Sequence, residues 1–117
     1  MDQLNELSAE FKRTTNCGEL RAANVGDRVV LNGWVNRRRD HGGLIFLDLR
    51  DRSGLVQAVL DPEVDADAHA MGHEVRSEYV LAIRGEVVAR DAEAINPNLP
   101  TGEVEIRCDA LAGLNTA

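Results

Sequence analysis

Aromatic residues and cysteines are scarce in this chain, and no apolar run occurs at its N-terminus. The two cysteines, Cys17 and Cys108, lie far apart and lack the spacing of a metal site. Without an apolar N-terminal run, the sequence offers no secretion signal. We therefore expect two free thiols, a reducing, cytoplasmic setting and no association with a membrane.

Basic residues are also in the minority. The 117 residues include 13 Lys and Arg against 20 Asp and Glu, which gives a net charge of -7 and argues against indiscriminate adhesion to nucleic acid. The positive charge is nevertheless clustered, because Arg37, Arg38, Arg39, Arg50 and Arg52 fall close together. Any binding to a polyanion must therefore be local. At this length we expect one domain that buries roughly two-thirds of its unfolded surface.

The stretch 44–51 combines a strand pattern with an aromatic residue on the wrong face. Its side chains alternate, so Ile45, Leu47 and Leu49 share one face and Phe46 lies on the other. The neighbours of Phe46 on that polar face are charged. A ring between a carboxylate and a guanidinium suits the stacking of an unpaired base. The alternative is a structural ring covered by a neighbouring loop.

Periodicity predicts three strands, one helix and then two strands. The strands are expected at 27–36, 44–51, 55–60, 78–90 and 102–108. The last should point Val104, Ile106 and Cys108 inward. Gly33 interrupts the first strand and predicts a bulge, which leaves the direction of Trp34 open.

Two helices complete the predicted element list. Asp61 is the expected N-cap of a helix that runs to about Arg76. The residues expected along one side of this helix are Val64, Ala68, Met71 and Val75. Residues 1–13 have helical spacing and predict a short N-terminal arm, which leaves 14–117 as the main domain.

This element order is the plan of a five-stranded OB-fold Greek-key barrel, an all-β fold with one helix between strands three and four. OB-folds bind oligonucleotides across strands two and three, between the loops that join strands one to two and four to five. Here the loops are predicted at 37–43 and 92–101, and Phe46 and Gln57 lie on the strands between them. The basic stretch, the ring and the polar residue therefore converge on one predicted site.

Two long runs resemble one known family. The run 33–43, Gly-Trp-Val-Asn-Arg-Arg-Arg-Asp-His-Gly-Gly, continues through Phe46 and Asp48 to Arg-Asp-Arg at 50–52. The second run is 96–105, Asn-Pro-Asn-Leu-Pro-Thr-Gly-Glu-Val-Glu. Both are similar to the N-terminal anticodon-binding domain of bacterial aspartyl-tRNA synthetases, and the similarity covers roughly residues 17–115.

The resemblance implies binding to the anticodon stem-loop of tRNA(Asp), which carries a guanosine, a uridine and a cytidine. It implies that Phe46 stacks on the central uridine, that Gln57 hydrogen-bonds to it and that Glu105 reads the third base. It places Arg39 against the anticodon stretch. The further expected tRNA-binding residues are Arg37, Arg38 and Asn96. The alternative for Glu105 is a simple ion pair with Arg107 or another basic neighbour.

Two positions depart from the family pattern. Ala94 stands where some relatives carry a polar residue that helps to bind the anticodon, so that contact is expected to be missing. His41, followed by two glycines, resembles members that also charge tRNA(Asn), whereas stricter members tend to have an aliphatic residue there. Discrimination at the third anticodon base therefore stays open between strict tRNA(Asp) and relaxed tRNA(Asp) and tRNA(Asn) recognition.

The chain lacks the class II catalytic motifs of the family. We expect it to be a fragment of a synthetase or a free-standing relative, unable by itself to activate aspartate. ATP and Mg²⁺ are expected only in the missing catalytic domain, and no cofactor here. The resemblance implies a homodimeric parent synthetase, with the isolated domain a monomer.

Two other readings of the sequence are weaker. His69 and His73 have the spacing of a metal pair but no obvious third ligand, so no metal site is expected. A generic single-strand-binding or protein-interaction OB module is the alternative function. The acidic net charge argues against the generic nucleic-acid binder, which normally carries a broad basic groove.

Overall fold

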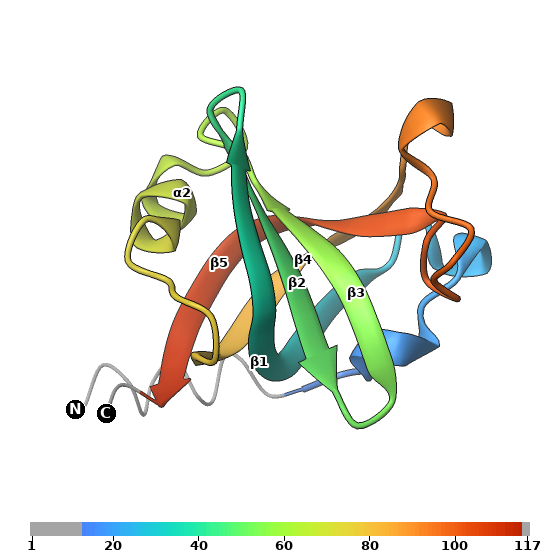
Figure 1. Ribbon diagram of the computed structural model, residues 1–117, viewed down its shortest axis with the longest axis horizontal. Helices are drawn as coiled ribbons and strands as arrows, with labels where there is room; N and C mark the ends of the chain where they lie inside the picture. The colour runs from blue at the N-terminus through green and yellow to red at the C-terminus, as the bar shows by residue number, and fades with distance from the viewer. Residues whose placement is uncertain (1–12, 116–117) are drawn as a thin grey trace.

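Five strands form a closed barrel in the computed structural model, which describes residues 13–115 (Figure 1). The strands are β1 (Arg28–His41), β2 (Leu44–Asp51), β3 (Gly54–Leu60), β4 (Val80–Ala89) and β5 (Val104–Asn115). Around the barrel their order is β1-β2-β3-β5-β4, and the helix α2 (Ala66–Gly72) lies between β3 and β4 in the chain. The predicted OB-fold is confirmed. The arm predicted at 1–13 lies outside the described residues, apart from Arg13.

β1 closes the barrel because it pairs with β4 along its first half and with β2 along its second. Gly33 lies where the strand passes from one neighbour to the other. A Cβ atom at this position would lie 2.4 Å from the carbonyl oxygen of Arg50, so the close approach requires glycine. The bulge itself is not at Gly33 but at Asn36, where the register shifts between Val35 and Arg37.

The stretch 37–43, predicted as a loop, is mostly regular strand. β1 continues to His41, and only Gly42 and Gly43 form the turn into β2, with φ angles of 59° and 83°. Two successive positive φ angles are what a tight hairpin turn needs, and glycine adopts them without strain. The consecutive charged residues hid the strand pattern. As a result, successive arginines of β1 project to opposite faces.

Aliphatic side chains from all five strands fill the barrel. Fully buried members include Leu31, Val35, Leu47, Leu49, Val56, Leu60, Ile83, Val87, Val104 and Ile106. The predicted inward positions of β5, including Cys108, are all buried, which confirms the alternation read from the sequence. The strand is longer than predicted and continues to Asn115.

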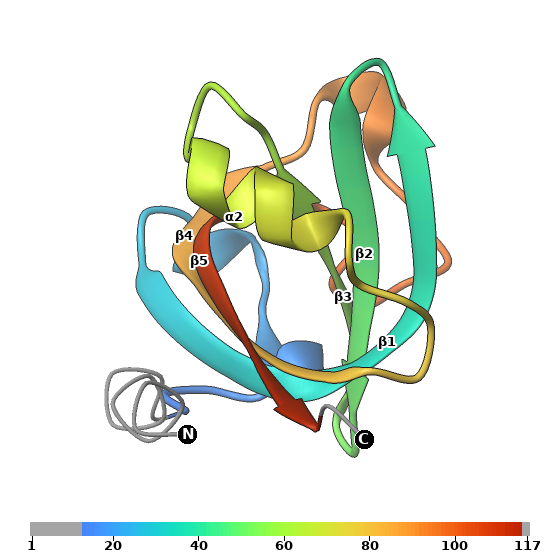
Figure 2. The ribbon, with the colours of Figure 1, turned by 90° about the vertical axis from the view of Figure 1, so that its left-hand side faces the viewer.

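α2 packs on β2, β3 and β5, on the side of the barrel away from the β4–β5 loop (Figures 1 and 2). It is shorter than predicted at both ends, because its N-cap is Asp65 rather than Asp61 and its last residue is Gly72 rather than about Arg76. Asp65 Oδ1 accepts a hydrogen bond from the backbone N–H of Ala68 at 2.9 Å, whereas Asp61 Oδ1 accepts from the N–H of Glu63 in the preceding turn. Within residues 13–115, no helix is long and apolar enough to cross a membrane.

The later helix start also corrects the predicted apolar stripe. Ala68 and Val75 are buried, as expected, but Val64 and Met71 are exposed. Val64 precedes the helix and belongs to the turn. Gly72 is buried against the core, where an added Cβ would lie 2.4 Å from Leu60 Cδ1, so this small residue lets α2 approach the barrel closely.

Candidate nucleic-acid interface

The bulge at Asn36 decides which arginines of β1 face outward. Arg37 pairs with Asp48 and Arg39 pairs with Phe46 in the ladder with β2. Residues that pair directly project to the same face. Because the intervening residues of β2 fill the core, Arg37 and Arg39 stand on the outer face with Phe46.

Phe46 is half-buried on this outer face, and Arg39 covers it in part. The guanidinium carbon of Arg39 lies 5.1 Å from the centroid of the Phe46 ring. This is a cation–π contact, which holds the guanidinium over the ring. The ring is therefore placed on the surface by strand alternation, as the sequence predicted, and carries a positive charge beside it.

Gln57 on β3 joins Arg39 to Glu105 on β5. Arg39 Nη2 donates to Gln57 Oε1 at 3.1 Å, and Gln57 Nε2 donates to Glu105 Oε1 at 2.9 Å. Gln57 is only 6% exposed, so its side chain is buried rather than solvent-facing. Glu105 bonds to Gln57. Within residues 13–115 it forms no ion pair with Arg107, the alternative considered for it.

The two bonds of Gln57 fix the orientation of its amide. The oxygen must face the Arg39 donor and the nitrogen must face the Glu105 carboxylate. Each end keeps further capacity, since the amide nitrogen has a second hydrogen and the oxygen a second lone pair. The amide can therefore present one donor and one acceptor to a base without changing its orientation. We call Arg37, Arg39, Phe46, Gln57 and Glu105 the front cluster.

The β4–β5 loop borders the front cluster. It contains the short 3-10 turn η3 (Ala92–Ala94) and supplies Asn96 and Leu99 to a hollow of about 290 Å³ that Arg37, Arg39 and Gln57 also line. Asn96 is held by its backbone, because its N–H donates to the Gly102 carbonyl at 3.1 Å. Its side-chain oxygen accepts from the N–H of Asn98 at 3.0 Å.

Arg90 also lines this hollow, and the sequence did not single it out. Its Nε donates to the Val104 carbonyl at 3.0 Å and its Nη1 to the Ala94 carbonyl at 3.1 Å. Burial lowers the pKa of the Arg90 guanidinium, while the carboxylates of Glu105 and Asp48 act in the opposite direction. Arg90 thus ties the loop to β5 and adds positive charge. An isolated arginine at the end of a strand carries no local signal of this role.

Arg38 lies apart from the front cluster. Its Nη1 donates to the carbonyls of His73 and Val75 at 3.1 and 2.9 Å, beyond the end of α2. Its remaining donors make a two-pronged ion pair with Asp40, at 2.9 Å for each bond. Only 18% of the Arg38 side chain is exposed. Most of its donors are therefore engaged within the protein, and RNA binding by Arg38 stays a prediction.

The two positions expected to modulate specificity, His41 and Ala94, lie outside the front cluster. His41 is exposed at the end of β1, next to the Gly42–Gly43 turn. Ala94 is exposed in η3, where its backbone N–H donates to the Asp91 carbonyl at 2.8 Å and its own carbonyl accepts from Arg90. Its methyl group offers no hydrogen bond to a ligand. Both side chains are therefore exposed to solvent.

The histidine pair and the cysteines have structural surroundings. Among the described residues, no three His, Cys, Asp or Glu side chains gather as metal ligands. His69 Nε2 lies 2.8 Å from the carbonyl oxygen of Gly43, and its ring meets that of His73 edge to face. Burial raises the pKa of both thiols, that of Cys108 to about 12, so both stay protonated and unreactive at neutral pH.

The chain belongs to the family described as tRNA anti-codon, OB-fold nucleic acid binding domain, whose model matches residues 29–112. Its relatives include the aspartate-tRNA(Asp/Asn) ligase of Acidobacterium capsulatum, 58% identical over 104 residues that cover 89% of this chain and 17% of the ligase. The corresponding ligase of Symbiobacterium thermophilum is 59% identical over 108 residues, 92% of this chain and 18% of the ligase. The domain is homologous to the N-terminal anticodon-binding region of such synthetases.

The chain spans less than a fifth of the length of these relatives. Solved structures agree on the fold. The asparaginyl-tRNA synthetase of Pyrococcus horikoshii superposes with a TM-score of 0.74 at 25% identity, over 92% of this chain and 24% of that one. The aspartyl-tRNA synthetase of Entamoeba histolytica gives 0.78 at 23% identity, over 95% and 23% of the two chains, which shows the likeness of fold alone.

Proposed function

We propose that this domain recognises the anticodon loop of tRNA(Asp) as part of an aspartate-tRNA ligase. The observation that carries the proposal is the connected row of the front cluster, in which a guanidinium, a ring, an amide and a carboxylate lie side by side on one face. A single-stranded loop needs these groups for stacking, for hydrogen bonds to base edges and for charge neutralisation. The ligases that resemble the chain support this choice of RNA.

Each member of the front cluster has a role that its geometry allows. Phe46 stacks on the central uridine, and the free donor and acceptor of the Gln57 amide match a uracil edge. A Glu105 oxygen accepts from the exocyclic amine of the cytidine at the third position. Arg37 and Arg39 neutralise phosphates or contact bases. Asn96 and Arg90 border the hollow beside them.

The proposal extends to tRNA(Asn), in which a uridine replaces the third cytidine. A uridine has no exocyclic amine, so Glu105 should favour tRNA(Asp) without excluding tRNA(Asn). His41 at the tip of the hairpin and the names of the two closely similar ligases support the relaxed range.

The wider context is proposed on the same resemblance. The ligase would be a cytoplasmic homodimer whose ATP and Mg²⁺ are held by a catalytic domain beyond the matched region, and this chain alone would be a cofactor-free monomer. Sedimentation equilibrium of the isolated chain tests the last point. A stable dimer would contradict it.

Stem-loop binding tests the function directly. The isolated chain is titrated with anticodon stem-loops of tRNA(Asp) and tRNA(Asn) and with a stem-loop of unrelated anticodon, at one fixed salt concentration. The expected order of affinity is tRNA(Asp), then tRNA(Asn), then the unrelated loop. Equal affinity for all three would support a generic single-strand binder instead.

A further inference from the structure

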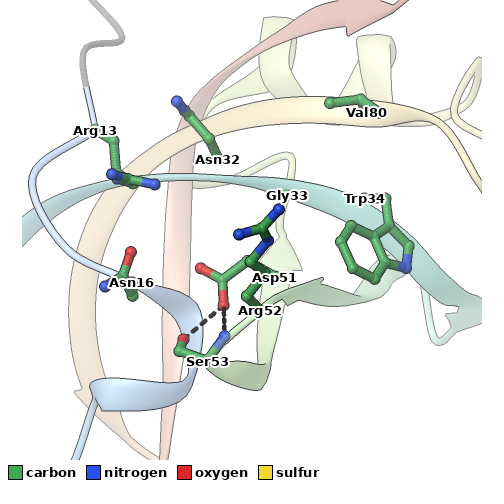
Figure 3. A pocket seen from close by; sticks show the side chains of 9 residues that line it. All are labelled: Arg13, Asn16, Asn32, Gly33, Trp34, Asp51, Arg52, Ser53 and Val80. Carbon is green, nitrogen blue, oxygen red and sulfur yellow. Dashed lines mark hydrogen bonds between the residues drawn. The ribbon is translucent and has the colours of Figure 1, made fainter.

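A second pocket lies on the outside of the barrel, where the β2–β3 turn meets β1 and β4 (Figure 3). Its volume of about 450 Å³ falls within the range of small-molecule sites. Trp34 and Val80 form an apolar wall, and Arg13 and Arg52 bring two guanidinium groups to the same space. The front cluster described above shares no residue with this pocket.

Trp34 is on the same outer face as Phe46. It pairs with Arg50 in the β1–β2 ladder, and Arg50 and Phe46 have the same parity on β2. Four residues along a strand correspond to roughly 13 Å. Trp34 is half-buried rather than a core residue, which settles the direction that the sequence left open. One face of the sheet therefore presents an aromatic ring at each end of β2.

The guanidinium groups of the pocket are available to a ligand. Arg13 and Arg52 are exposed, and neither has a recorded ion pair with another residue of the range 13–115. The carboxylate of Asp51 beside them already accepts hydrogen bonds from the backbone N–H groups of Cys17 and Ser53, each at 2.8 Å. In a chain of net charge -7, this is a locally positive place.

The pocket also contains an incomplete hydrogen bond. Asn32 lines it, and within residues 13–115 the buried Oδ1 atom of Asn32 has no hydrogen-bond partner. A buried acceptor without a donor is unfavourable. The features that the pocket offers to a ligand are the Trp34 ring as a stacking surface and the two guanidinium groups.

We propose that the Trp34 pocket binds a second nucleotide of the RNA held by the front cluster, with its base against Trp34 and its phosphate between Arg13 and Arg52. The identity of the RNA rests on the proposed function; the chemistry of the pocket does not. RNA is favoured over a polypeptide because the two rings share one sheet face. An RNA strand bound at Phe46 would extend along this face toward Trp34. The free guanidinium groups match a phosphate.

Intrinsic fluorescence tests the pocket directly, because Trp34 is the only tryptophan of the chain. The probes are the tRNA(Asp) anticodon stem-loop and a short oligouridylate. We expect RNA to quench Trp34 emission in proportion to the occupancy measured separately by anisotropy of labelled RNA. Unchanged emission at saturating RNA would overturn the proposal and leave the pocket to a polypeptide partner.

Variants separate contact from proximity. Trp34→Ala should weaken stem-loop binding by about five- to 150-fold, the loss of one stacked base, whereas Trp34→Phe should keep most of the affinity. Tyr79→Ala, which removes another exposed ring near the start of β4, should leave stem-loop affinity unchanged.

Arg52→Ala should lower the slope of log affinity against log salt by about one unit, and the matched change at exposed Arg76 should not. Circular dichroism checks the fold of each variant.

Two patterns of failure are distinguishable. If Phe46→Ala abolishes the preference for the tRNA(Asp) loop while Trp34→Ala and Arg52→Ala bind it as tightly as the wild type, the second site is wrong and the proposed function stands. If Trp34→Ala weakens all RNAs while Phe46→Ala has no effect, the second site stands and the anticodon role of the front cluster is wrong.

Discussion

The outer face of the β1–β2 hairpin and the side that meets α2 use arginine in opposite ways. On the outer face, Arg39 rests over Phe46 and gives one recorded hydrogen bond, to Gln57. On the other side, Arg38 donates hydrogen bonds to Asp40 and to two backbone carbonyls after α2. The two residues are adjacent in the chain, so strand parity alone places Arg39 on the outer face and Arg38 against the segment after α2.

The contrast shows what an arginine-rich run can and cannot indicate. A run of positive charge predicts a polyanion site only for those members that reach solvent with donors to spare. Arg38 instead links β1 to the segment that follows α2 through its hydrogen bonds. Substitutions on the side that meets α2 should therefore lower stability. Substitutions on the outer face should lower RNA affinity.

The largest expected effect is on the structural side. Arg38→Ala removes the donors to the carbonyls of His73 and Val75, and hydrogen bonds from charged groups are worth about 1.5–3 kcal/mol each. Partial exposure reduces the sum, so we expect a loss of about 2–3 kcal/mol in the free energy of unfolding by urea. Stem-loop affinity should stay unchanged. A loss of affinity at full stability would restore Arg38 as an RNA contact.

Arg37→Ala is the matched control for that change. Arg37 is exposed on the outer face, so its removal should alter stability by less than about 0.5 kcal/mol. If Arg37 neutralises one phosphate, the slope of log affinity against log salt should fall by about one unit, equally for all stem-loops. Arg38→Ala should therefore lower stability without changing RNA binding. Arg37→Ala should change the salt dependence of RNA binding without lowering stability.

The sequence predicted the part of this contrast that depends on unbroken alternation. β2 has no bulge, so the outward position of Phe46 and the buried positions of Ile45 and Leu47 could be read directly. The side on which Arg38 lies could not be read, because it depends on a register shift at Asn36 that is set by pairing with β2. Local composition carries no signal of that shift.

Long-range contacts set the second limit. Gln57 and Glu105 are 48 positions apart, and their hydrogen bond exists because β3 and β5 are neighbours in the barrel. Periodicity placed each residue on a strand, but only the family resemblance linked them. Arg90 was missed for the same reason, since its partners Ala94 and Val104 become neighbours only when the β4–β5 loop folds back.

The next effect in size concerns the ring of the outer face. Phe46→Ala should weaken stem-loop binding by about 2 kcal/mol, because one stacked base is lost, and isothermal titration would measure it. Phe46→Leu is the control for the purely structural reading: it keeps apolar cover over the strand but offers no ring. Full affinity in the leucine variant would mean that Phe46 does not stack.

A smaller effect should appear as a change in selectivity. Glu105→Ala should narrow the preference for the loop ending in cytidine over the loop ending in uridine by about 1 kcal/mol, at the low end for a base contact because only one hydrogen bond is involved. Glu103→Ala removes an exposed carboxylate two residues away and should leave the preference intact. Equal loss on both loops, or equal gain from relieved repulsion, would show that Glu105 does not read the base.

The smallest expected effect is on the pKa of Asp40, which forms an ion pair with Arg38. The Arg38 guanidinium holds the pKa of the Asp40 carboxyl below its ordinary value, chiefly through their hydrogen bonds. Because the folded pKa is depressed, the pair favours folding above the ordinary carboxyl pKa, and this contribution is lost as the pH falls through the folded value. In Arg38→Ala the pKa of Asp40 should rise toward normal, which a carbon-13 NMR titration of the carboxyl would follow. In Arg37→Ala it should stay depressed, since Arg37 points to the opposite face. An unchanged pKa in the Arg38 variant would mean that the ion pair does not persist in solution. The structural role of Arg38 would then rest on its hydrogen bonds to backbone carbonyls alone.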